Sequence, residues 1–101
     1  LEKQGEVVKT WRKRWFVMKQ GKMFWFLDEH VTMQTKSRGV IDVANGECVS
    51  VKGAEETTGN ANSFEIVTKN CGVMYFICPN RQEKEQWMNR IGRAIVMGRR
   101  R

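Results

Sequence analysis

The hydrophobic pattern of the chain changes its period once, at Pro79 and Asn80. Before this point, apolar and polar residues alternate in short runs separated by turn residues, a pattern typical of antiparallel strands. After it, Trp87, Ile91 and Ile95 recur at helical spacing and form one apolar stripe. The sequence therefore predicts a series of strands followed by one closing helix.

Seven segments have the composition and alternation of strands. They span residues 1–4, 11–19, 22–27, 39–43, 48–52, 63–68 and 73–78. Residues 28–38 and 53–62 are polar and lack periodicity, so we expect loops there. The helix is expected near Asn80 to Met97, with Asn80 as its N-cap, Glu83 completing a capping-box pattern, and Gly98 as its stop.

Consecutive antiparallel strands in this number must curl or close to protect their edges, and a terminal helix can cover one open end. We therefore predict a mainly β fold: a seven-stranded, partly open antiparallel barrel capped by a C-terminal α-helix. With 101 residues, of which 41% are hydrophobic, the chain suits one domain with one modest core. Its ends, at Leu1 and at the run 99–101, indicate a single domain excised from a longer protein.

The net charge of +7 favours anionic partners such as a membrane surface, nucleic acid or acidic peptides. The three cysteines are an odd number without paired spacing, which favours a reduced, intracellular compartment over a disulfide framework. We find no signal peptide and no apolar run approaching the roughly 18 residues of a membrane span. The chain is therefore expected to touch a membrane without crossing it.

A basic run leads directly into one of the most apolar predicted strands. It contains Lys3, Lys9, Arg12, Lys13 and Arg14. Because side chains alternate along a strand, Arg12 and Arg14 share a face with Phe16 and Met18. If that face lines the core, two guanidinium groups point inward at the strand's end, where they need a polyanion or an open polar mouth. The pattern thus predicts a phosphate site; the alternative is a solvated charge run paired with Glu2 and Glu6.

The strand order and the final helix with its central Trp87 resemble a pleckstrin homology (PH) domain over essentially all 101 residues. The most specific pieces are Lys3-(eight residues)-Arg12-Lys13-Arg14-Trp15-Phe16 and the helical segment EKEQWMNRI at 83–91. The first resembles the pattern of PH domains that bind phosphoinositide headgroups. The resemblance implies a non-catalytic module that binds these lipids and recruits a larger protein to a cytoplasmic membrane face.

Phosphates on an inositol ring point in several directions, so donors must converge on them from different segments. Lys3 would come from the first strand, Lys9 from the following loop, and Arg12 and Arg14 from the second strand. The resemblance implies that Arg38, just before the fourth strand, also contacts the headgroup and that Lys36 assists it. It also implies that Trp25 occupies a position where inositol-lipid binders often carry tyrosine; an indole can only donate a hydrogen bond.

Val7 and Val8 are apolar residues in the basic loop, where they can enter the lipid headgroup region. The alternative is that they pack on the base of their own loop. A headgroup clamp combined with these two valines would give reversible membrane binding.

Catalysis finds little support in the sequence. His30, the single histidine, lies in a polar loop without a matched nucleophile. Cys71 and Cys78 lack metal-ligand spacing, and no glycine-rich phosphate loop is present. We expect no catalytic residue, no metal and no cofactor.

Two other functions compete with lipid binding. Trp11, Trp15 and Trp25 interleaved with basic residues suit base stacking. However, they alternate as strand positions do, and the basic residues gather at one end, so no nucleic acid is expected. A protein-interaction domain, presenting a sheet edge or loop to a peptide or small GTPase, remains the open alternative. We expect a monomer.

Overall fold

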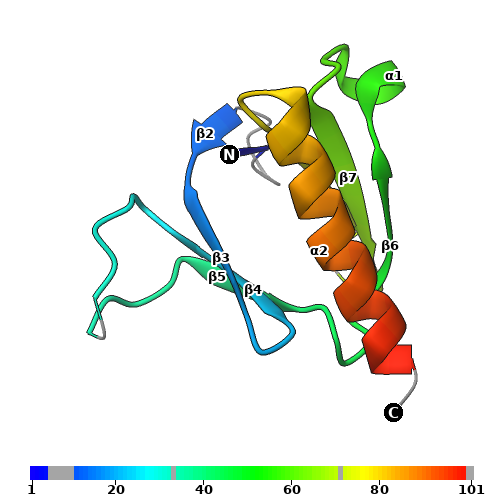
Figure 1. Cartoon of the computed structure of the whole chain (residues 1–101). Helices are drawn as coiled ribbons and strands as arrows, with labels where there is room; N and C mark the ends of the chain where they lie inside the picture. Colours follow the sequence, from blue (N-terminus) through cyan, green and yellow to red (C-terminus); the bar gives the residue numbers. More distant parts are fainter. Residues whose placement is uncertain (5–10, 33, 71, 100–101) are drawn as a thin grey trace.

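The computed structural model of the chain describes residues 1–4, 11–32, 34–70 and 72–99 (Figure 1). Within these residues, the strands form two antiparallel sheets. The larger sheet has the order β2-β1-β8-β7-β6 and consists of β1 (Glu2–Gln4), β2 (Trp11–Lys13), β6 (Cys48–Gly53), β7 (Ser63–Thr68) and β8 (Val73–Ile77). The smaller sheet has the order β3-β4-β5 and consists of β3 (Trp15–Lys19), β4 (Lys22–Phe26) and β5 (Gly39–Asp42).

The C-terminal helix α2 (Arg81–Arg99) lies along β6 and β7 (Figure 1). Asn80 is its N-cap as predicted, because the Glu83 amide donates a hydrogen bond to Asn80 Oδ1 at 2.8 Å. A short helix, α1 (Glu55–Thr58), interrupts residues 53–62, where we expected loop throughout. Gly59 ends α1 in the left-handed conformation, with φ of 76°. A helix of one turn leaves no periodic signal in the sequence, which is why that expectation was wrong.

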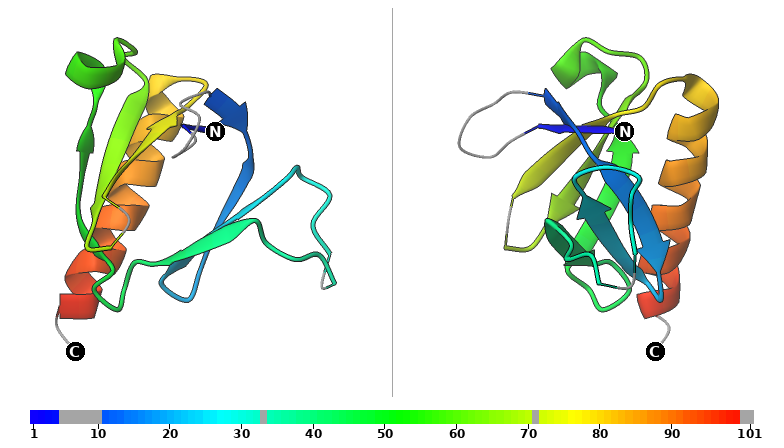
Figure 2. Two further views of the ribbon diagram at one scale, coloured as in Figure 1. Left: turned by 180° about the vertical axis from the view of Figure 1, so that it is seen from behind. Right: turned by 90° about the vertical axis from the view of Figure 1, so that its left-hand side faces the viewer.

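The predicted mainly β fold with a capping C-terminal helix is confirmed, but one predicted strand is divided. Residues 11–19 form β2 and β3, which belong to different sheets and are separated at Arg14. The Arg14 amide still donates to the carbonyl oxygen of Leu1 at 3.1 Å, whereas Trp15 already pairs with Phe26 of the smaller sheet. Figure 2 shows the two sheets set at an angle, with this segment passing from one to the other.

The core fills the space between the sheets and α2. Phe64 and Phe76 are fully buried and stack with ring centroids 5.1 Å apart. The ring centroid of Phe16, on β3, lies 5.5 Å from that of Phe76 and 6.3 Å from that of Trp87 on α2. Both pairs are in edge-to-face geometry. Trp87 therefore joins the core as the helical stripe predicted, although its ring stays partly exposed and Arg90 lies over it. These aromatic contacts connect both sheets to the helix.

The two described cysteines, Cys48 and Cys78, are buried and free. Burial raises the pKa of the Cys48 thiol to about 12 and that of Cys78 to about 11. Both thiols therefore stay protonated at neutral pH and behave as small core side chains. Cys71 lies outside the described residues. In the described part of the chain, no helix combines the length and apolarity required to cross a bilayer.

Gly98 does not stop the helix, contrary to the prediction, because α2 continues through it to Arg99. A Cβ atom at Gly98 would overlap the backbone carbonyl of Ala44, in the segment that joins β5 to β6. The glycine is therefore needed for close packing of helix against backbone. Gly92 differs, because a Cβ there would meet Val51 at an ordinary 3.9 Å.

These two glycines predict opposite effects of the same substitution. Gly98→Ala should lower the free energy of unfolding by about 1–3 kcal/mol, because the helix must move off Ala44. Gly92→Ala should leave it unchanged or raise it by up to about 1 kcal/mol, since alanine is the better helix former. Urea denaturation of the two variants measures the difference. Equal stabilities would show that the close approach at Ala44 imposes no constraint.

Candidate functional site

Trp25 of β4 is the centre around which several predicted site residues gather. Its side chain is half-buried, packs against the core, and lies with its ring centroid 6.0 Å from that of Phe16. Gly39 of β5 is its direct register partner, and a Cβ atom at Gly39 would overlap the indole ring. The indole is thus held between the core and the bare backbone of Gly39.

Lys3 of β1 extends over this indole. Its Nζ lies 5.2 Å from the centroid of the Trp25 ring, within cation–π range. In the register, Lys3 faces the buried Phe76 of β8 on one side and Arg12 of β2 on the other. Directly opposite residues share one face of a sheet, so Lys3 leaves β1 on the core side, as the predicted site requires. For Arg12 the structure describes the backbone only, which lies directly across from Lys3.

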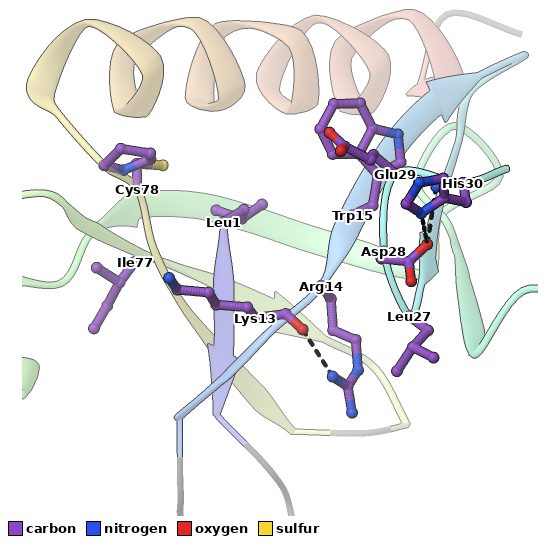
Figure 3. Close-up of a pocket in the computed structure, with 11 residues that line it drawn as sticks. Leu1, Lys13, Arg14, Trp15, Leu27, Asp28, Glu29, His30, Ile77 and Cys78 are labelled. Atoms are coloured by element: carbon purple, nitrogen blue, oxygen red, sulfur yellow. Dashed lines mark hydrogen bonds and ion pairs between the residues drawn. The ribbon is translucent and has the colours of Figure 1, made fainter.

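Arg14 and Arg38 border the same region. The Arg14 side chain is half-buried, and its Nη1 donates to the carbonyl oxygen of Lys13 at 2.7 Å. In Figure 3 it extends away from α2, toward the end of the sheet where β1 and β2 lead into residues 5–10. The Arg38 amide donates to the carbonyl oxygen of Trp25 at 2.7 Å, while its side chain is exposed. Lys36 is exposed two residues earlier.

Three of the cations near this site, Arg14, Lys36 and Arg38, are not neutralised by the acids that the structure describes. Within the described ranges, no carboxylate forms an ion pair with Arg14, Lys36 or Arg38. The structure thus brings Lys3, Trp25 and the backbones of positions 12 and 38 together, with Arg14 at the border. Lys9, Val7 and Val8 lie outside the described residues, so their predicted roles remain predictions.

Trp25 has a contact that the sequence analysis did not anticipate. The sequence analysis placed Trp25 where inositol-lipid binders often carry tyrosine and considered only its indole N–H, whereas in the structure its ring also lies beneath the Lys3 ammonium. Its packing against the core also removes it from the set of aromatic residues proposed for base stacking. The sequence signal for this arrangement was Gly39, which alone among common residues leaves room for an indole on the neighbouring strand.

A pocket of about 480 Å³ opens between β1, β3 and the residues that precede α2, and sequence reasoning missed it (Figure 3). It is lined by Leu1, Lys13, Arg14, Trp15, Leu27, Asp28, Glu29, His30, Ile77, Cys78 and Pro79. At its rim the His30 amide donates to Asp28 Oδ1 at 2.9 Å, and this bond lowers the pKa of the Asp28 carboxyl. The one sequence signal was Leu27, an apolar residue that follows β4 directly and is 55% exposed.

The fold agrees with a comparison against known families. The family model "PH domain" matches residues 1–96. The chain belongs to the pleckstrin homology domain family. PH domains are commonly used for membrane targeting or protein interaction and are generally non-catalytic modules.

Known PH proteins resemble this chain in sequence and in fold. "Pleckstrin homology domain-containing protein 1" of Arabidopsis thaliana is 47% identical over 98 residues, which cover 95% of this chain and 66% of that protein. The solution structure of the PH domain of human KIAA0053 protein has a TM-score of 0.73 at 23% identity, covering 94% of this chain and 83% of that one. The C-terminal PH domain of pleckstrin in complex with D-myo-Ins(1,2,3,4,5)P5 has a TM-score of 0.68 at 24% identity. The match covers 92% of this chain and 89% of that one.

This chain spans just under two thirds of the Arabidopsis protein. Its matched region covers 18% of the Dictyostelium discoideum serine/threonine-protein kinase pakC, to which it is 30% identical. The matched region is therefore most of one relative and a small part of the other.

The support of Trp25 by Gly39 can be tested by Gly39→Ala. The added methyl group must displace the indole, so we expect the free energy of unfolding to fall by about 1–3 kcal/mol. The NMR signal of the Trp25 indole N–H should also shift. Gly53→Ala is the matched control, because a Cβ at that strand glycine meets only the flexible end of Lys84. An equal response of the two variants would contradict the proposed clamping of the ring.

Proposed function

We propose that this PH domain binds phosphoinositide headgroups at a mouth formed by Lys3, Lys9, Arg12, Arg14 and Arg38, and recruits a larger protein to a cytoplasmic membrane face. The observation that carries the proposal is the position of the Lys3 ammonium over Trp25, with the Arg12 backbone directly opposite. Three segments of the chain thereby contribute to one region, as a multiply phosphorylated ring requires.

The electrostatics of the region support a polyanionic ligand. Arginine offers a planar fork that can hold two phosphate oxygens, while lysine acts as a movable point charge. Because no described carboxylate pairs with Arg14 or Arg38, an incoming phosphate does not have to displace an acid from either. The net charge of +7 adds a long-range attraction to an anionic leaflet.

The structural neighbours give further support. The C-terminal PH domain of pleckstrin was solved in complex with D-myo-Ins(1,2,3,4,5)P5 and with D-myo-Ins(1,2,3,5,6)P5. Inositol phosphates carry the chemistry of the proposed headgroup, and this chain shares that fold. We further predict that Lys36 assists the headgroup contact and that Val7 and Val8 enter the headgroup layer, where each basic residue nearby adds about 1 kcal/mol.

The decisive variant is Arg14→Ala, measured by sedimentation with phosphatidylcholine vesicles that each contain a single phosphoinositide. Binding should weaken by about 10- to 100-fold, because a hydrogen bond to a charged group contributes about 1.5–3 kcal/mol. The free energy of unfolding should change by less than about 0.5 kcal/mol, since Arg14 donates only to a neighbouring carbonyl.

Arg93→Ala is the matched control, because Arg93 is an exposed arginine on α2 and its loss changes the net charge equally. We expect it to retain nearly full vesicle binding. If Arg14→Ala binds as the wild type does, the mouth is not the lipid site. If Arg14→Ala unfolds at a much lower temperature, the arginine is structural.

Binding to phosphoinositide vesicles should weaken steeply as salt is raised from about 0.01 to 0.15 M, where the Debye length falls from about 30 to about 8 Å. The same measurement with neutral phosphatidylcholine vesicles provides the baseline. Binding that is indifferent to salt over this range would indicate apolar insertion in place of charge recognition.

A further inference from the structure

The turn that joins β5 to β6 contacts three other parts of the fold. The Ala44 amide donates to the carbonyl oxygen of Gly21, in the turn between β3 and β4, at 2.9 Å. The carbonyl of Ala44 lies against Gly98, near the end of α2 (Figure 1). The Lys69 amide, just after β7, donates to the carbonyl oxygen of Glu47 at 3.0 Å. A change in this turn therefore reaches both sheets and the helix.

The same turn carries the single asparagine–glycine pair of the chain, Asn45-Gly46. In such a pair, the backbone nitrogen that follows the asparagine can attack the side-chain amide carbon. Glycine allows this approach because it has no side chain to hinder it. Asn45 is exposed to water, and Gly46 has a φ of 87°, a backbone conformation that favours glycine. The two reacting groups are one residue apart, so their reaction is intramolecular.

The nitrogen that would attack is not held by a hydrogen bond. Within the described part of the chain, the Gly46 amide donates to no acceptor, whereas the amides of Ala44 and Glu47 donate at 2.9 and 3.3 Å. The exposed Lys69 lies beside the same glycine, because a Cβ atom on Gly46 would be 3.7 Å from Lys69 Nζ. A positive charge this close favours the amide anion that attacks.

The other charges of the turn are engaged elsewhere. Asp42 Oδ2 accepts a hydrogen bond from Asn45 Nδ2 at 2.8 Å, and Glu47 Oε2 accepts one from the Asp42 amide at 2.8 Å. Lys69 forms no ion pair with any carboxylate that the structure describes. Its charge is therefore available to Gly46.

We propose that Asn45-Gly46 is a self-modification site, at which the turn deamidates with the help of Lys69 and then loosens. The Gly46 amide loses its proton to solvent hydroxide, and its nitrogen attacks the side-chain carbonyl carbon of Asn45. As this carbon–nitrogen bond forms, the bond from the carbon to Nδ2 breaks, and Nδ2 takes a proton from water and leaves as ammonia. The product is a five-membered succinimide ring.

Water then opens this ring, and nothing is oxidised or reduced. Addition of water to the former side-chain carbonyl gives an aspartate at position 45. Addition to the backbone carbonyl gives an isoaspartate, in which the main chain runs through the former side chain and is one carbon longer.

Either product removes a contact on which the turn depends. The Asn45 amide donor is replaced by a carboxylate, which repels the carboxylate of Asp42. The other oxygen of Asp42, Oδ1, is already buried without a hydrogen-bond donor among the described residues. The site is independent of the proposed lipid mouth, because Asp42 ends β5 at the opposite end from Gly39.

The reaction is measured by mass spectrometry during incubation in warm, mildly alkaline buffer. The tryptic peptide of residues 39–52 should gain about one mass unit, the difference between an amide and a carboxyl group, and separate into aspartate and isoaspartate forms. Lys69→Gln should slow the conversion about three- to fivefold, the effect of one surface charge at this range. Lys36→Gln, the same change at an exposed lysine of another loop, should leave the rate unchanged.

A synthetic peptide of residues 39–52 provides the rate without the fold. A folded domain that stays unconverted while this peptide deamidates would overturn the proposal. Equal rates in the two lysine variants would overturn it as well.

The consequence for the fold is measured with Asn45→Asp, which reproduces one product. Its melting temperature should fall by about 2–8 °C, because a hydrogen bond to a charged group is lost. Asn89→Asp, the same change at an exposed position of α2, should lower it by less than about 2 °C. Combining Asn45→Asp with Asp42→Asn exchanges donor and acceptor and should recover most of the loss. If Asn45→Asp is as stable as the wild type, or the double variant as unstable as the single one, the turn does not depend on this contact.

Discussion

The corner at Arg14 determines where the basic residues of this domain lie. The Arg14 amide still bonds to Leu1 of the larger sheet, while the next residue, Trp15, already pairs within the smaller one. One continuous segment therefore serves as an edge of both sheets. Position 12 lies before the corner and Phe16 after it, so cationic side chains and a central core aromatic lie within a few residues of each other. The basic residues therefore lie where the chain passes from one sheet to the other, and the Arg14 side chain there is half-buried, not part of the core.

The contact with the Trp25 ring restricts the side chain of Lys3 before any ligand binds. A free lysine side chain loses rotamer freedom when it binds, at a cost of about 0.5–1.5 kcal/mol. A cation–π contact at a partly exposed site contributes about 0.5–1 kcal/mol, which offsets much of that loss before a ligand arrives. The indole provides this support only because Gly39 leaves space for it. A glycine on the neighbouring strand thus acts indirectly on a lysine of the proposed site.

Sequence patterns predicted the structure correctly where the signal lies within a single strand or helix. Ser63–Thr68 and the N-cap of α2 were predicted correctly, because alternation and capping are local signals. The corner at Arg14 was not, since no turn residue interrupts residues 11–19 and the change of pairing partner is a tertiary event. Gly98 was misread because a glycine near a helix end commonly acts as a stop, and its contact with Ala44 comes from a distant segment.

The candidate site shows the same division. Strand phase predicted that Arg12 and Arg14 point inward, and the basic spacing that resembles PH domains added Lys3 from the first strand. The structure places Lys3 directly opposite position 12. The role of Trp25 did not follow, because its ring reaches Lys3 only when the two sheets are packed together. The pocket beside Leu27 was not predicted either, since its walls come from Leu1, residues 13–15, residues 27–30 and residues 77–79. The periodicity of a single element cannot predict a surface assembled from several distant segments.

The face of the smaller sheet that points away from the core shows a further limit of predictions from sequence patterns. In Trp15-Phe16-Val17-Met18 both phases of the strand are apolar, so alternation alone cannot say which phase the core uses. The structure assigns Phe16 to the core and leaves Trp15 46% exposed. Core packing accounts for only one of the two phases. Val17, Phe24 and Val40 continue that other phase across the three strands, so its apolar character has to be explained by something other than the packing of this core.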